Sequence, residues 1–226
     1  MTHPVPDPSV VRRASLRELE NMGLPVPPPN FPLVWEPGDG IELRPLHEIE
    51  ERVAILNVVL ARCFGLSPDA GMAWLIQAEL ADRLTEPERQ FVAAGEGDRR
   101  IFSLHLDALF ALCWTLGLVM DLDPVQTSPD GLVDRLPDLA RFESYQQWRA
   151  RTLTALRAPV DVAIALDLYY CLDWAYVEAE KHDLPLPGPL NSNAIGQRRW
   201  ALEWAVVFTG PFHDAAPNWE EIDLST

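Results

Sequence analysis

Apolar residues recur at helical spacing in one segment after another, and this periodicity constrains the fold most. In residues 46–64 they stand at Ile49, Val53, Leu56 and Leu60, which places them on one face of a helix. Further segments behave alike, and we expect helices at residues 7–22, 67–84, 85–94, 101–120, 159–182 and 192–209. Residues 137–156 have a weaker, more polar helical pattern, which leaves a continuous and a broken helix both open. No long stretch alternates with the two-residue period of a strand. The sequence therefore predicts an all-α fold, an irregular bundle of about seven or eight helices.

One of these segments, residues 101–120, is apolar nearly all round. A helix that is hydrophobic on every side belongs in the interior, so we expect this segment to be the buried central helix. No polar, flexible linker divides the chain into parts. The sequence therefore predicts a single helical domain over residues 1–226.

Proline and glycine mark the irregular parts of the chain. Six prolines lie between Gly23 and Pro37, which predicts an extended connection and excludes a helix there. Because Phe31 and Trp35 are apolar, we expect residues 23–45 to pack on the body of the protein. Residues 211–226 follow the last helical segment and are expected to form an irregular acidic tail.

The balance of charge points to a class of partner. The chain has 18 lysines and arginines against 34 aspartates and glutamates, a formal net charge of −16 at pH 7. Such a surface repels nucleic acid and anionic lipid and attracts a basic protein or a cationic ligand. The same charge also serves solubility alone, and this simpler interpretation stays open.

Cysteine usage and the apolar runs bear on the compartment. Cys63, Cys113 and Cys171 are odd in number and widely spaced, which indicates reduced core thiols and a reducing compartment. Residues 1–10 lack the pattern of a signal peptide. The longest apolar run, residues 108–120, falls short of the roughly 20 residues that span a bilayer. We therefore expect a cytoplasmic protein that does not enter a membrane.

Motifs for catalysis or cofactors are missing from the sequence. No two of the five histidines are three or four residues apart, and the chain has no Gly-x-Ser-x-Gly, no glycine-rich phosphate loop and no Cys-x-x-Cys. We therefore predict no metal, no cofactor and no catalytic residue. The eight tryptophans are expected mostly in the core.

Two charged residues stand among apolar helical positions. Asp167 borders the apolar stripe of residues 159–182, and Arg199 lies on the stripe of residues 192–209. A buried charge needs a partner, so we predict that Asp167 contacts Arg199 or Arg198. The pair either fixes the register of two helices or lines a polar pocket.

Several short stretches resemble those of one protein family. They are Arg12-Arg13, Ser15-Leu16, Leu19, Gly23, Pro25, Leu43-Arg44, Glu51-Arg52-Val53, Leu84-Thr85, Glu88, Phe91, Trp114, Leu116-Gly117, Asp167-Leu168-Tyr169-Tyr170, Trp174-Ala175, Gln197-Arg198-Arg199, Ala201-Leu202, Trp204 and Trp219-Glu220-Glu221-Ile222. The chain resembles the bacterial domain-of-unknown-function family forty-two seventy-two from Arg12 to its end. The resemblance implies one helical domain of bacterial origin and no established activity. The chain departs from the family at Gln197, where glutamate is frequent, and at Glu220-Glu221, where two aspartates are.

These observations lead to one expected site and one expected function. The site is a polar or binding cluster of Asp167, Tyr169, Tyr170, Trp174, Arg198, Arg199, Trp204, Trp219, Glu220 and Glu221. The function is that of a non-catalytic cytoplasmic module that binds a basic protein, and an immunity or antitoxin-like protein within that class. The acidic stretches 121–138 and 214–223 would supply carboxylates at the rim of the interface. The alternative is an enzyme or a small-molecule-binding protein with a polar cleft around Asp167 and Arg198 or Arg199.

Overall fold

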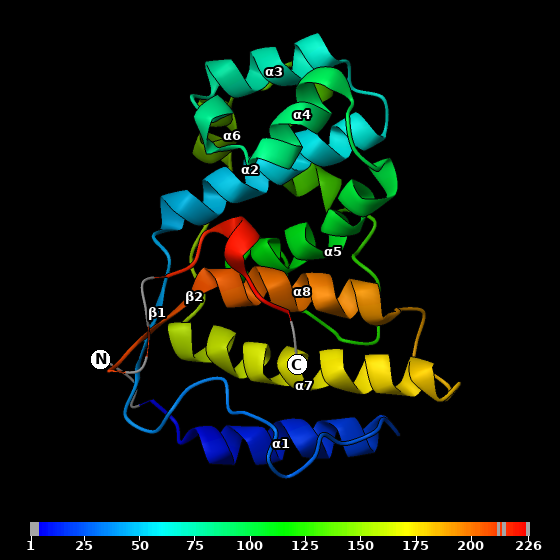
Figure 1. Cartoon of the computed structure of the whole chain (residues 1–226). Coiled ribbons are helices and arrows are strands. Elements are labelled where there is room, and N and C mark those ends of the chain that lie inside the picture. Colours follow the sequence, from blue (N-terminus) through cyan, green and yellow to red (C-terminus); the bar gives the residue numbers. More distant parts are fainter. Residues whose placement is uncertain (1–4, 212, 214–215, 225–226) are drawn as a thin grey trace. The chain divides into compact units, whose positions relative to one another are not determined.

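A computed structural model of the chain describes residues 5–211, 213 and 216–224. This part of the chain forms eight α-helices, four short 3-10 helices and one two-stranded sheet. The predicted all-α fold is therefore confirmed (Figure 1). The chain divides into two compact units, which we call the terminal unit (described residues of Met1–Arg44, Leu122–Thr127 and Arg157–Thr226) and the middle unit (Pro45–Asp121 and Ser128–Leu156). The prediction of a single domain stays a prediction.

The terminal unit is built from three long helices and the small sheet. Its elements are α1 (Pro8–Asn21), β1 (Gly40–Leu43), α7 (Pro159–Lys181), α8 (Ser192–Ala205), β2 (Val206–Thr209) and η4 (Trp219–Glu221). Helix α7 packs against α1 on one side and against α8 on the other (Figure 1). It is therefore buried around most of its circumference, and its buried residues include two aspartates, Asp167 and Asp173.

The segment 192–209 corrects one prediction. The last helix was expected to continue to Thr209, but α8 ends at Ala205 and residues 206–209 form β2. Strand β2 pairs antiparallel with β1, with Gly40 opposite Thr209 and Leu43 opposite Val206. β-branched residues suit a strand, and the backbone of β1 supplies the pairing that overrides the helical pattern. In the proline-rich stretch before β1, Trp35 is buried and its ring stacks on Phe208.

The middle unit holds the remaining helices. Its elements are α2 (Leu46–Cys63), α3 (Pro68–Gln77), η1 (Ala81–Arg83), α4 (Glu86–Ala94), α5 (Arg99–Thr115), η2 (Val133–Arg135), η3 (Leu139–Arg141) and α6 (Tyr145–Arg151). Helix α2 packs along α5, and α3 packs on α2 and α4. A capping box between Thr85 and Glu88 begins α4, and Gly95 ends it in the left-handed conformation.

Segment 101–120 forms a shorter helix than expected, and segment 137–156, whose helical pattern was weak, is broken. Helix α5 ends at Thr115, because Gly117 turns the chain with a φ of 69°. Its second half, from Ala108 to Cys113, is fully buried, whereas Ile101 near its beginning is exposed. Within 137–156 only η3 and α6 are helical, so about half of this segment is irregular.

Candidate binding groove and polar core

Asp167 lies in the core of the terminal unit, with only 1% of its surface exposed. Arg12 donates to it from Nε and Nη2, with an Nη2 to Oδ1 distance of 2.8 Å. The Ser15 hydroxyl donates to Oδ2 at 2.6 Å. The predicted contact of Asp167 with Arg199 or Arg198 is therefore wrong, because both carboxylate oxygens face helix α1.

Arg199 instead reaches a different carboxylate of the same helix. Its Nη1 donates to Asp173 Oδ2 at 2.7 Å, and its Nε donates to Glu203 Oε2 at 3.1 Å. Asp173 follows Asp167 by six positions, a rotation of about 240° around an α-helix. The two aspartates thus point to opposite neighbours of α7. The apolar stripe of α7 alone could not show which of the two aspartates faces α1 and which faces α8.

The ring of Tyr170 connects the two ion pairs. The guanidinium of Arg199 lies 4.5 Å from its ring centroid, and that of Arg12 lies 5.6 Å from it. Phe31 packs beside the same ring at 4.8 Å between centroids. Guanidinium groups over aromatic faces are mutually favourable. Residues from the N-terminal connection, α1, α7 and α8 therefore form one polar core.

Arg198 serves another part of the terminal unit. It donates to the carbonyl oxygens of Asp123 at 2.7 Å and Gln126 at 2.8 Å, and it also contacts the hydroxyl of Tyr169. That hydroxyl donates to the carbonyl of Leu122 at 3.2 Å. Fully buried Arg198 therefore fixes the segment 122–127 on the unit.

The other expected site residues lie nearer the surface or in aromatic packing. Trp174 approaches Phe31, and Trp204 packs edge-on against Trp219. Glu220 and Glu221 are exposed. A hydrogen bond from the Asn218 N–H lowers the pKa of Glu221, which makes it a cap of η4. The expected cluster is thus divided: Tyr170 and Arg199 contact each other, Arg198 and Tyr169 hold the segment 122–127, and Trp204 packs with Trp219.

The carboxylates around Arg199 titrate unusually. Burial raises the pKa of Asp173 and of Glu203, although Arg199 favours the charged form of both. The nearby charges of Asp173 and Asp223 act in the same direction on the pKa of Glu203. Arg199 thus pairs with two carboxylates whose pKa values are raised by desolvation.

A groove lies on the surface of the middle unit. It has two adjoining hollows of about 670 Å³ and about 420 Å³ that share Asn57, Ala61, Val133 and Leu136. The remaining lining residues come from α2, α5 and the irregular wall, namely Leu60, Phe64, Leu106, Leu109, Ser128, Pro129, Asp130, Leu132, Asp134, Pro137, Asp138, Leu139, Ala140, Arg141, Glu143 and Arg151. We call this feature the middle-unit groove. Its floor is mostly apolar, and carboxylates lie along it.

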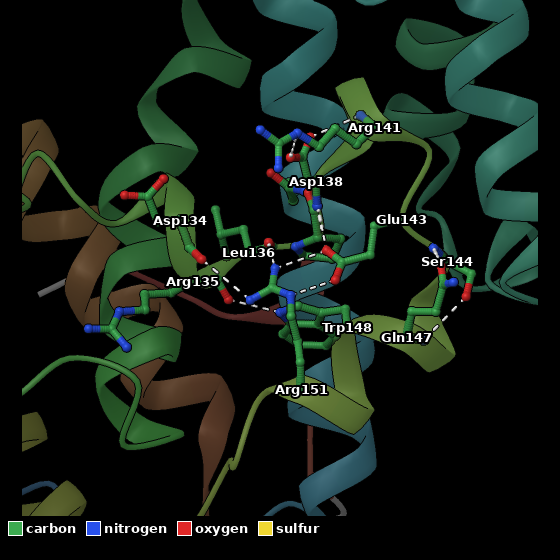
Figure 2. Close-up of polar contacts among 12 residues, drawn as sticks. Asp134, Arg135, Leu136, Asp138, Arg141, Glu143, Ser144, Gln147, Trp148 and Arg151 are labelled. Carbon is green, nitrogen blue, oxygen red and sulfur yellow. Dashed lines mark hydrogen bonds and ion pairs between the residues drawn. The ribbon is translucent and has the colours of Figure 1, made fainter.

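Arg151 holds the wall of the groove together. It donates to the carboxylate of Glu143 and, at 2.7 Å, to the carbonyl oxygen of Leu136 (Figure 2). Glu143 also accepts the N–H of Asp138 at 2.8 Å. The hydrogen bond from Arg151 lowers the pKa of Glu143, so this pair stays ionised at neutral pH. The wall is therefore an ordered loop pinned by one arginine.

The rim of the groove offers groups that the fold itself does not use. Asp130 and Asp134 are exposed, and neither carboxylate forms an ion pair within the described residues. Phe142 is 82% exposed and has a φ of 55°, a left-handed conformation that is strained for a bulky side chain. Asn57 donates to the carbonyl of Pro137 at 2.9 Å. The sequence predicted that the acidic stretch 121–138 would supply carboxylates at the rim of an interface. It contained no pattern that singled out Phe142.

The comparisons with known proteins identify the family. The model of the family described as Domain of unknown function (DUF4272) matches residues 12–222. The chain therefore belongs to this family, as its motifs indicated. No curated protein and no solved structure matches the chain.

The described residues contain no group of three or more histidine, cysteine, aspartate or glutamate side chains arranged to hold a metal ion. None of their helices is long and apolar enough to cross a membrane. All three cysteines are buried and free, and burial raises the pKa of the Cys171 thiol to about 12.

Proposed function

We propose that this protein is a non-catalytic binding module whose middle-unit groove holds a basic, amphipathic helix of a protein partner. The observation that carries the proposal is the combination of an apolar floor, unpaired rim carboxylates and an exposed Phe142 in a strained backbone. A helix laid in a groove buries one apolar face and leaves its polar face at the rim.

Apolar contact would supply the affinity. Val133 and Phe64, which line the groove, are 67% and 75% exposed, and their burial would contribute roughly 25 cal/mol for each Å². Aromatic side chains are enriched in the cores of interfaces. Phe142 lines neither hollow but lies in sequence between the lining residues Arg141 and Glu143, and we propose that it anchors the partner from the rim.

Charge would supply the orientation and the speed of association. Asp130 and Asp134 are free to pair with lysine or arginine of a helix in the groove. The net charge of −16 steers a cationic partner toward the protein over a distance of about one Debye length. Within this class we propose an immunity or antitoxin-like role in a bacterial cytoplasm, in which the acidic groove covers a basic partner.

The test uses a defined peptide. An 18-residue, fluorescein-labelled helix of leucine and lysine would be titrated with the protein and followed by fluorescence anisotropy. We expect Phe142→Ala, and separately the double variant Asp130→Asn/Asp134→Asn, to weaken binding about 10-fold, or about 1.4 kcal/mol. Raising the salt concentration should weaken binding to the wild type and much less to the double variant.

A matched control separates the groove from general attraction to an acidic protein. Glu79 and Glu96 are exposed residues of the same unit that do not line the groove. The double variant Glu79→Gln/Glu96→Gln should bind the peptide within about two-fold of the wild type. Equal losses in both double variants would refute the groove. For the immunity role, a toxin gene beside this one and capture of its basic product by wild type but not by Phe142→Ala are the expected results.

A further inference from the structure

A second hollow, of about 420 Å³, lies in the terminal unit. Its lining residues come from the proline-rich connection, α7, the junction of α8 with β2, and the segment after β2, namely Leu33, Val34, Tyr170, Glu203, Val206, Val207, Phe208, His213, Ala216 and Pro217. We call it the terminal-unit pocket. Seven of these ten residues are apolar, and three are polar. A small number of polar groups in an apolar hollow is the usual composition of a small-molecule site.

Each polar lining residue has an atom that no described residue satisfies. Glu203 gives Oε2 to Arg199, and its Oε1 accepts no hydrogen bond within the described part of the chain. The hydroxyl of Tyr170 likewise has no hydrogen-bond partner there; its contacts are those of the ring with Phe31, Arg12 and Arg199.

His213 is the third, and its geometry decides what it offers. Its Nε2 lies 2.6 Å from Oδ2 of buried Asp39. Burial opposes the charge of Asp39, but the hydrogen bonds from His213 and from the Glu36 N–H outweigh it and lower the pKa of Asp39. An ionised Asp39 fixes the proton on Nε2. In neutral His213, Nδ1 is then left as an acceptor.

The described lining residues of the pocket include one acid, Glu203, and no lysine or arginine. Arg44 lies near the pocket, where it donates to the backbone carbonyl of Pro217. Arg199, behind the pocket, is shared by the carboxylates of Asp173 and Glu203, and Arg12 is taken by Asp167. Carboxylate, imidazole nitrogen and phenol oxygen are all acceptors, and the aromatic ring of Phe208 forms part of the wall. These unsatisfied acceptors are therefore suited to a ligand that donates hydrogen bonds from a positively charged group.

We infer that the terminal-unit pocket binds a small organic amine, with its ammonium group on Glu203 and its apolar body against Phe208 and the valines. A primary ammonium has three N–H donors, as many as the described lining residues offer as open acceptors when His213 is neutral. Desolvated ammonium groups also gain from aromatic faces. This site is independent of the middle-unit groove, so either proposal can fail without the other.

The test compares three probes of similar shape and different charge. Phenethylamine, 2-phenylethanol and 3-phenylpropionate would be titrated into the full chain by isothermal calorimetry, with saturation-transfer NMR to detect weak binding. Phenethylamine should bind at least 10-fold more tightly than the alcohol, and the carboxylate should not bind. Equal binding of amine and alcohol, or no binding of the amine at 10 mM, would overturn the inference.

Three variants locate the amine. Glu203→Gln keeps an acceptor for Arg199 and removes the charge, and should weaken binding of phenethylamine about 10-fold. Tyr170→Phe removes only the hydroxyl and should weaken it about three-fold, which keeps the test usable if the first variant folds poorly. The control Glu20→Gln removes one exposed charge from α1 and should leave binding unchanged. Unchanged binding in both pocket variants would place the amine elsewhere and overturn the inference.

Discussion

In the terminal unit, carboxylates near the candidate site are buried against arginines of neighbouring helices, whereas at the middle-unit groove two carboxylates, Asp130 and Asp134, lie open along the rim. Asp167 and Asp173 each pair with an arginine that is itself buried. Asp130 and Asp134 are exposed and have no ion-pair partner among the described residues. A buried charge without its partner destabilises the fold strongly, whereas an exposed charge contributes little to stability. The difference separates residues that hold the fold from residues that are free to bind.

The largest expected effect is on the buried pair of α1 and α7. Asp167→Ala leaves Arg12 and the Ser15 hydroxyl without their acceptor, and should lower the free energy of unfolding by about 3–5 kcal/mol. Urea unfolding measures this loss. The matched change at the rim, Asp130→Ala, should cost less than about 0.5 kcal/mol. Similar losses at the two positions would show that burial does not distinguish them.

The buried pair of the middle unit tests the same contrast through pH. Burial would raise the pKa of Glu88, but the charge and hydrogen bond of Arg52 outweigh it and lower the pKa. The contribution of Glu88 is therefore present above its usual pKa of 4.5 and is lost as pH falls through the lowered value. Glu88→Gln should cost about 2–3 kcal/mol at pH 7, and the difference from wild type should shrink below pH ~4.

Glu203, in the terminal unit, should show the opposite dependence of stability on pH. Because burial raises its pKa, its contribution to stability is full at low pH and is lost as pH rises through the raised value. The free energy of unfolding of Glu203→Gln should therefore fall furthest below that of the wild type at acidic pH. At the same pH the free energy of unfolding of Glu88→Gln should approach that of the wild type. Urea unfolding of the wild type and both variants from pH 3 to 7 measures how each free energy difference changes with pH. If the two differences changed with pH in the same direction, the assigned pKa shifts of Glu88 and Glu203 would be contradicted.

The sequence predicts most helices because their signals are local. The apolar spacing in residues 46–64 predicted α2 to within one residue of its end at Cys63, and the capping box at Thr85 marked the beginning of α4. Strand β2 was missed because its pairing partner β1 lies more than 160 residues earlier in the chain. A local pattern holds no information about such a partner.

The candidate sites were predictable only in part, for the same reason. Asp167 and Arg199 were recognised as buried charges, but Arg12 is 155 residues from Asp167, and α7 faces two neighbours. The groove depends on an irregular wall that has no periodicity. Asn57, an amide within the apolar face of α2 that lines the groove, was an overlooked signal for it in the sequence.

A smaller effect concerns the wall of the groove. Arg151→Ala removes the bonds to Glu143 and to the carbonyl of Leu136, and should cost about 1–2 kcal/mol. Hydrogen–deuterium exchange should become faster in residues 134–143. Arg141, whose side chain is exposed and lies 3.5 Å from Asp138, is the control, and Arg141→Ala should change neither stability nor exchange measurably.

The smallest expected effect reverses the usual sign and sharpens the contrast at Phe142. A left-handed backbone costs a residue with a Cβ about 1–2 kcal/mol, and glycine loses about 0.5–1 kcal/mol more chain entropy on folding. Because the Phe142 side chain is mostly exposed, Phe142→Gly should raise the free energy of unfolding by roughly 0.5–1 kcal/mol. Phe64→Gly, at an exposed phenylalanine with a φ of −105°, relieves no strain and should lower it. A gain in stability together with weaker binding of the leucine–lysine peptide would show that the strain at Phe142 is retained for binding. A loss of stability in Phe142→Gly would instead place this side chain among those that hold the fold.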